Sequence, residues 1–126
     1  MTVRYFTLKE ANEALAEIEP LMGRLLETQA RAVRKSRQIE HLLQDSHVDF
    51  GGALPSELTQ EFAQIEELLG QIRSFGCVIK NLEGGLIDFL AKIDDRDVYL
   101  CWRYGEDRIT HYHELHTGFQ GRIALE

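Results

Sequence analysis

The stretch that decides the fold is Val98-Tyr99-Leu100-Cys101-Trp102-Arg103. Its alternate residues Val98, Leu100 and Trp102 are all apolar, and they share one face if the chain is extended, because successive side chains of a strand point to opposite sides. β-Branched and aromatic residues, which favour strands, make up half of the stretch. The pattern therefore predicts a strand with one buried face.

Short strand-like runs surround this stretch on both sides. They are separated by turn residues such as Gly84-Gly85, Asp94-Asp95 and Gly105, and such close spacing is typical of antiparallel neighbours. We predict an antiparallel β-meander of about four strands and an irregular tail within residues 75–126. The other three strand candidates are Cys77–Lys80, Leu86–Leu90 and Ile109–His113.

Before residue 75 the apolar spacing changes to three and four residues, which is typical of helices. Thr7 and Glu10 have the spacing of a capping box, so a long helix is expected to begin there. Pro20 predicts either a kink or two helices end to end, and we expect a kink. The turn residues of Asp45–Pro55 predict a connection, after which Ser56 is a candidate helix cap.

The second helix carries its own apolar stripe, so we expect the two helices to form an antiparallel hairpin over residues 7–74. Folding back brings the basic residues Arg34, Lys35 and Arg37 level with the acidic residues Glu61, Glu66 and Glu67. The first helix is longer than its neighbour, and the part before Pro20 needs the sheet, or a second subunit, to bury its stripe. The whole chain, residues 1–126, is thus predicted to be a single α+β domain.

Composition limits the classes of partner. The formal net charge of −7 opposes binding to nucleic acid or to anionic lipid, because both begin with cationic neutralisation. No apolar run approaches the roughly 18 residues needed to cross a bilayer, and no leader is recognisable near Met1, so we expect a cytoplasmic protein without membrane or nucleic-acid partners. Cys77 and Cys101 are expected to be reduced apolar residues of the strands.

Four stretches of sequence resemble a known family. They are Arg4–Asn12, Gly84–Phe89, Leu100–Glu106 and His113–Arg122. With these stretches the chain resembles a small bacterial family designated only as domain of unknown function two-two-zero-three. The resemblance spans nearly the whole chain and implies a shared fold, a cytoplasmic setting and a suggestion of metal binding, but no reaction.

The clearest candidates for chemistry are the histidines of His111-Tyr112-His113-Glu114-Leu115-His116. In an extended chain His111 and His113 project from one face, a spacing that can hold a divalent metal such as zinc. His113 with Glu114 is the favoured pair, and turns and neighbouring strands offer further carboxylates. The predicted metal ligands are therefore His113, Glu114, Asp88, Glu83, Glu106 and His111. The alternative is that the histidines lie on a solvated strand face.

Asp88 stands between Ile87 and Phe89 in the most apolar run. A buried carboxylate there would need a cation or a metal, or its pKa would be raised by desolvation so that it could act as a general acid or base. Plain strand alternation instead points Asp88 to water with Lys92 nearby, and this is the interpretation that the pattern favours.

The residues leave two classes of function open. The first is a metal-binding protein, with or without metal-dependent catalysis. The second is a non-catalytic interaction module in which the overhanging helix forms a homodimer.

A set of aromatic and basic residues could line an apolar pocket for an anionic ligand, although aromatic residues at strand spacing are more often core. The set is Trp102, Tyr104, Tyr112 and Phe119, with Arg103 and Arg122.

Overall fold

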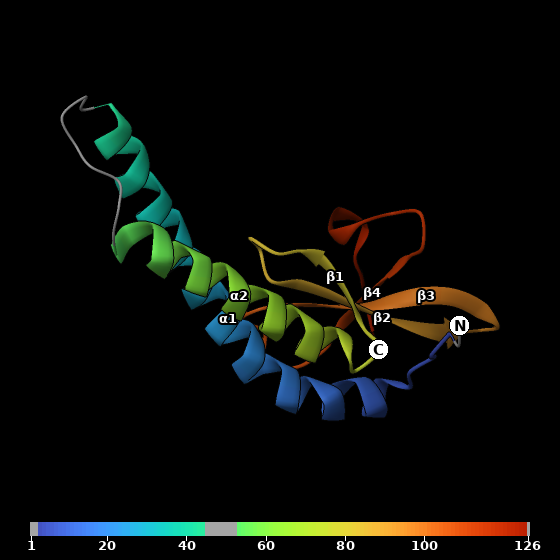
Figure 1. Ribbon diagram of the computed structural model, residues 1–126. Coiled ribbons are helices and arrows are strands. Elements are labelled where there is room, and N and C mark those ends of the chain that lie inside the picture. The colour runs from blue at the N-terminus through green and yellow to red at the C-terminus, as the bar shows by residue number, and fades with distance from the viewer. Residues whose placement is uncertain (1–2, 45–52, 126) are drawn as a thin grey trace.

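The structure is a computed structural model that describes residues 3–44 and 53–125. Two helices come first and a five-stranded antiparallel sheet follows, so the α+β class is as predicted (Figure 1). The helices form a hairpin that packs on one face of the sheet and extends beyond it. The elements are α1 Leu8–Leu43, α2 Ala53–Arg73, β1 Val78–Asn81, β2 Leu86–Ile93, β3 Arg96–Arg103, β4 His111–Glu114, η1 Phe119–Gly121 and β5 Ile123–Ala124.

Helix α1 is one continuous helix of 36 residues. The capping box is confirmed, because the Thr7 side chain accepts from the Glu10 amide and the Glu10 side chain accepts from the Thr7 amide. Pro20 lies inside the helix and does not divide it in two. The first half of the helix buries its apolar stripe against the sheet, as expected from the overhang, with Ile18 and Met22 fully buried in the same core cluster as Phe89.

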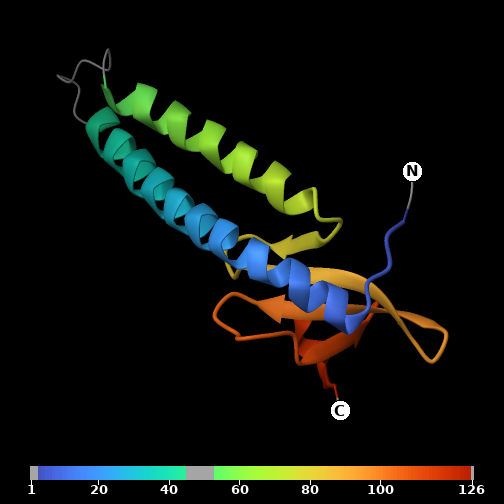
Figure 2. The same ribbon diagram turned by 90° about the horizontal axis from the view of Figure 1, so that it is seen from below.

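Helix α2 has 21 residues and packs antiparallel on α1, and the far end of this hairpin extends beyond the sheet (Figure 2). The helix begins at Ala53, which makes the predicted cap at Ser56 wrong; the rest of the predicted connection, residues 45–52, lies outside the described residues. The basic and acidic stretches do pair, through Lys35 and Glu61 at 2.6 Å, with Arg31 joining Glu61 at 3.4 Å.

The sheet is a meander in which each strand pairs with the next one along the chain. The strand predicted from Val98 to Arg103 is confirmed within β3, where Val98, Leu100 and Trp102 are buried against the helices. The prediction of about four strands was one short. The tail was expected to be irregular, but it forms η1 and then β5, which pairs with β4 through His111 and Tyr112.

The two faces of the sheet have different coverings. One face packs on the helices. The segment from Thr117 to Arg122, which we call the covering segment, folds over the other face, on the far side of the sheet from the hairpin (Figure 1). A side chain that alternation turns away from the helices can therefore still be buried. This second covered face holds the candidate site.

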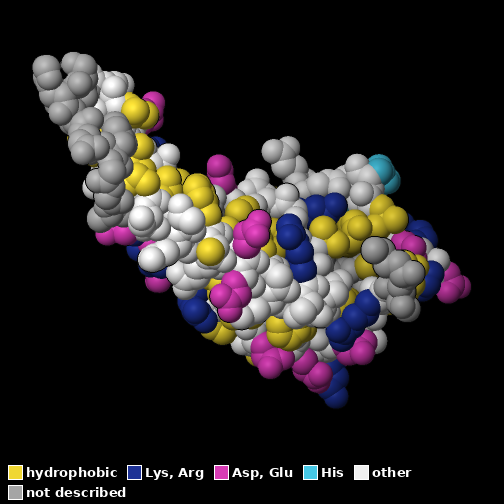
Figure 3. Space-filling view, in the orientation of Figure 1, with side chains coloured by type: hydrophobic (Ala, Val, Ile, Leu, Met, Phe, Trp, Pro, Cys, Tyr) yellow, Lys and Arg dark blue, Asp and Glu magenta, His cyan; other side chains and the backbone are white. Residues whose placement is uncertain are grey.

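Beyond the sheet, the hairpin exposes apolar side chains. Val33, Leu43 and Phe62 are 42%, 65% and 53% exposed, and apolar atoms gather along this part of the hairpin (Figure 3). Among the helices of the described residues, none has the length and apolarity needed to cross a membrane.

Candidate functional site

The centre of the candidate site is a contact between Asp88 of β2 and His113 of β4. The Asp88 Oδ2 and His113 Nε2 atoms are 2.9 Å apart, and the two residues are only 3% and 2% exposed. Strand β3 lies between them, with Cys101 opposite Asp88 and Tyr99 opposite His113. The pair thus spans two strand spacings, roughly 10 Å of sheet, on the face turned away from the helices.

A second hydrogen bond fixes the tautomer of His113. Its Nδ1 atom lies 2.8 Å from the backbone carbonyl oxygen of Glu114. Because a carbonyl can only accept, Nδ1 carries a hydrogen and donates it. The Nε2 atom and the Asp88 carboxyl group therefore share one proton, either as imidazolium and carboxylate or as neutral imidazole and carboxylic acid, and both arrangements are neutral overall.

Burial and nearby charge act on this proton in opposite directions. Burial raises the pKa of Asp88, because its carboxylate loses water, while the charges of His113 and Lys80 and the hydrogen bond to His113 work to lower it. The net direction is upward. A carboxyl group with a raised pKa, bonded to an imidazole, can exchange a proton with a bound molecule.

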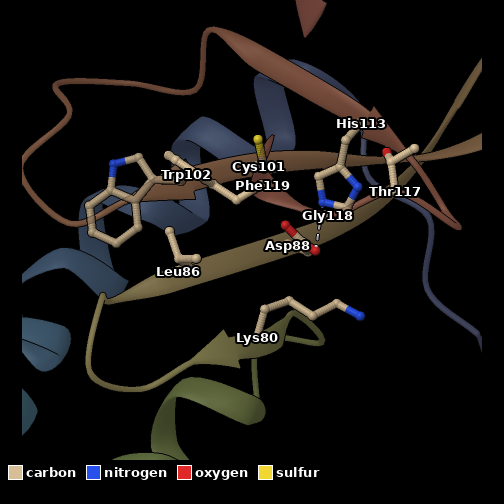
Figure 4. Close-up of a pocket in the computed structure, with 9 residues that line it drawn as sticks. All are labelled: Lys80, Leu86, Asp88, Cys101, Trp102, His113, Thr117, Gly118 and Phe119. Carbon is tan, nitrogen blue, oxygen red and sulfur yellow. Dashed lines mark hydrogen bonds and ion pairs between the residues drawn. The ribbon is translucent and has the colours of Figure 1, made fainter. Parts of the chain in front are cut away.

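The pair forms part of the wall of a pocket of about 120 Å³. At about 30 Å³ per water molecule in the liquid, this is room for roughly four waters or a small organic molecule. Side chains of β1, β2, β3 and β4 and of the covering segment surround it (Figure 4). The lining residues are Lys80, Leu86, Asp88, Cys101, Trp102, His113, Thr117, Gly118 and Phe119.

The covering segment is tied to the sheet beside the pocket. Arg122 donates to both carboxylate oxygens of Glu106, at 3.0 and 2.8 Å, and its Nε lies 3.2 Å from the Cys101 sulfur. The same guanidinium lies 4.5 Å from the centre of the Phe119 ring, a cation–π contact that holds Phe119 over the sheet. Desolvation raises the pKa of the Cys101 thiol, so this sulfur is neutral and is no activated nucleophile.

The structure brings together two of the six residues predicted as metal ligands, Asp88 and His113. The interpretation that Asp88 points to water beside Lys92 was wrong: Asp88 is buried on His113, whereas Lys92 pairs with Asp97 at 2.9 Å. The physical reason is that the face opposite the helices is covered by a segment distant in sequence.

The other four predicted ligands lie elsewhere. The Glu114 side chain pairs with Arg96 at 2.6 Å, and Glu106 is held by Arg122. His111 lies beside the Thr110 hydroxyl, at 2.9 Å, and Glu83 borders a separate hollow beside α1. Within residues 3–44 and 53–125, no group of three or more His, Cys, Asp and Glu side chains comes together as the ligands of a metal ion would.

Sequence reasoning had named two of the pocket's aromatic residues, Trp102 and Phe119, but it missed Lys80. Lys80, an exposed residue, lines the edge of the pocket from an irregularity of β1. Ile79 pairs with Ile87 and Asn81 pairs with Leu86, so Lys80 is the extra residue between them. A bulge of this kind redirects a side chain. Neither the composition nor the spacing of residues in Val78–Asn81 predicts this bulge.

Fold and site together define a small α+β protein with a ligand-sized pocket built around a buried acid–base pair. The chain belongs to the family described as "Uncharacterized conserved protein (DUF2203)", whose sequence profile matches residues 4–125. Searches of curated proteins and of solved structures found no match to the chain.

Proposed function

We propose that the protein binds a small molecule in the pocket and that the Asp88–His113 pair exchanges a proton with it. The observation that carries the proposal is the 2.9 Å contact between two buried titratable groups at the wall of a cavity. Burying such a pair costs desolvation free energy, and well-packed apolar residues are often at least as stabilising. A polar pair retained beside a cavity is thus better explained by chemistry than by stability.

The experiment is a binding screen read by backbone amide NMR on the full chain, with small carboxylic acids, amides and amines as probes. Support would be shifts confined to Trp102, Thr117 and Gly118, lost in His113→Asn. His116→Asn, an exposed histidine three positions away, is the matched control and should bind as the unaltered protein does.

Proton exchange needs its own measurement. Calorimetry of the best probe in two buffers of different ionisation enthalpy reports the number of protons taken up or released. We expect a non-zero number in the unaltered protein and a number near zero in Asp88→Asn. Binding without proton exchange, or binding that is insensitive to His113, would refute the proposal.

A divalent metal is a second candidate ligand, favoured by the Nδ1 hydrogen bond of His113. Metal-bound histidines usually donate their other ring hydrogen to a carbonyl or carboxylate, as His113 does to Glu114. The pair itself supplies only two donors, so a zinc ion would need further ligands from water or substrate. Elemental analysis of untagged protein tests this; stoichiometric metal that falls in His113→Ala would support it, and equal trace amounts in both would exclude it.

An interaction module is the remaining candidate, favoured by the exposed Val33, Leu43 and Phe62. Two hairpins packed side by side would bury these side chains as a homodimer, because exposed apolar surface of this kind often marks an interface. Light scattering over a range of concentrations tests it, and a monomer throughout would count against it. We place the protein in the cytoplasm, in keeping with its two free cysteines.

A further inference from the structure

The charges around the pocket do not cancel. Four ionisable side chains line it, namely Lys80, Asp88, Cys101 and His113. Asp88 and His113 share one proton and are neutral as a pair, and Cys101 is a neutral thiol because burial raises its pKa. The ammonium group of Lys80 remains, so the lining carries one net positive charge in a chain whose formal charge is −7.

Lys80 is placed there by the backbone. It is the extra residue of the bulge in β1, and its exposed side chain runs past Asp88 at the edge of the pocket (Figure 4). Its ammonium lies 4.9 Å from the centre of the Tyr99 ring, and among residues 3–44 and 53–125 it has no carboxylate within ion-pair distance. A cation at the wall of an apolar pocket, without an anionic partner in that part of the chain, is arranged to receive an anion from outside.

The other residues that line the pocket indicate what the uncharged part of the ligand is like. Leu86 and Phe119 are apolar and Phe119 is aromatic, so the remaining surface favours a short apolar or flat group, while the Trp102 ring is buried on the helix side of the sheet. Arg122 and Glu106 neutralise one another behind Phe119, so they do not change the charge that a ligand meets.

We propose that the ligand is a small monoanion, a carboxylate on a short apolar body, whose anionic group pairs with Lys80 while its body lies against Leu86 and Phe119. This inference rests on the proposed function, since it assumes that the pocket is the binding site. The inference specifies the charge of the ligand and names Lys80 as the residue that binds the charged group.

The test compares probes of equal shape and different charge. Benzoate and benzamide form one series, and butyrate and butyramide form another with a flexible body. Binding to the full chain is followed by the amide signals of Trp102, Thr117 and Gly118. We expect each carboxylate to bind about tenfold more tightly than its amide, a factor that corresponds to about 1.4 kcal/mol, and we expect this preference to weaken as salt screens the charge.

Two variants assign the preference to Lys80. Lys80→Gln should bring the carboxylate and the amide to equal affinity while the amide's affinity stays unchanged. Lys92→Gln removes the same charge from the same sheet, where Lys92 pairs with Asp97 away from the pocket, and should keep the tenfold preference.

The outcomes separate the two proposals. If the amides bind in the pocket as tightly as the carboxylates, or if Lys80→Gln keeps the preference, the monoanion inference is wrong and the pocket remains a binding site. If neither series shifts the pocket signals at the highest soluble concentration, the proposed function fails and this inference fails with it.

Discussion

Replacing His113 by Leu should be costly, and the cost should grow with pH. The change leaves the Asp88 carboxyl, 3% exposed, without the imidazole bonded to it at 2.9 Å. Removing one partner of a buried ion pair typically costs 3–5 kcal/mol. Because Lys80 still lowers the pKa of Asp88, we expect the lower end, about 3 kcal/mol at pH 8.

The sign of the pH dependence follows from the direction of the Asp88 pKa. Burial raises the pKa of this carboxyl, and loss of the opposing His113 charge raises it further. An acid whose pKa is higher in the folded than in the unfolded state contributes stability that is present below the unfolded pKa and is lost as pH rises through the folded pKa. His113→Leu should therefore be closer to the unaltered protein at pH 5 than at pH 8.

Urea unfolding at both pH values measures these free energies. The matched control is the double variant Asp88→Leu with His113→Leu, in which no polar group is left unpaired. We expect it to cost about 1 kcal/mol or less, because apolar replacement of both partners can be nearly neutral. A double variant that costs the sum of the two single changes, or a His113→Leu cost equal at pH 5 and pH 8, would refute the buried-pair reasoning.

Three more predictions follow from other contacts. Gly85→Ala should lower stability by about 1 kcal/mol or more in thermal unfolding, because Gly85 has a φ of +66° and an added Cβ would lie 2.7 Å from the Tyr104 Cβ; an unchanged melting temperature would contradict this. Glu61→Gln should be less stable than the unaltered protein at pH 7, because the bonded lysine lowers the pKa of the Glu61 carboxyl and the folded state therefore favours its charged form. The Glu61 carboxylate is protonated only below the ordinary glutamate range, so the stability difference should shrink as pH falls through that range. A difference that is constant down to pH 3 would contradict this. Neither Cys77 nor Cys101 should react readily with a thiol reagent at pH 8 until the protein unfolds, since burial raises the pKa of Cys77 to about 11 and also raises that of Cys101; rapid labelling of the native protein would show that the thiols are accessible.

The hairpin and the strands were predictable because their signals are local. The capping box at Thr7 involves only four consecutive residues, and the alternation that predicts β3 involves only six. Leu100 and Trp102 pack where their spacing placed them. Each of these features depends on the chain's own period, so the sequence contains it without reference to distant segments.

The site was only half predictable because burial of the second face is not local. Alternation correctly turned Asp88 away from the helices, and the error was to assume that this face meets water. It is covered by Thr117 to Arg122, about thirty positions further along, through contacts such as that between Arg122 and Glu106. The bulge that turns Lys80 toward the pocket depends on pairing with β2, which the Val78–Asn81 run does not reveal.

The two faces of the sheet differ in what they bury, and this difference favours a functional role for the pocket. The helix-facing side carries the apolar core, with Phe89 and Trp102 fully buried, and supplies the hydrophobic burial that stabilises the fold. If the second face served stability alone, apolar residues at Asp88 and His113 would serve at least as well, since an ion pair must first be stripped of water. The chain instead places a carboxyl and an imidazole there, fixes the imidazole's tautomer through Glu114, and leaves a cavity beside them. A cavity forfeits packing contacts, so pair and cavity together are better explained by a bound ligand than by the demands of folding.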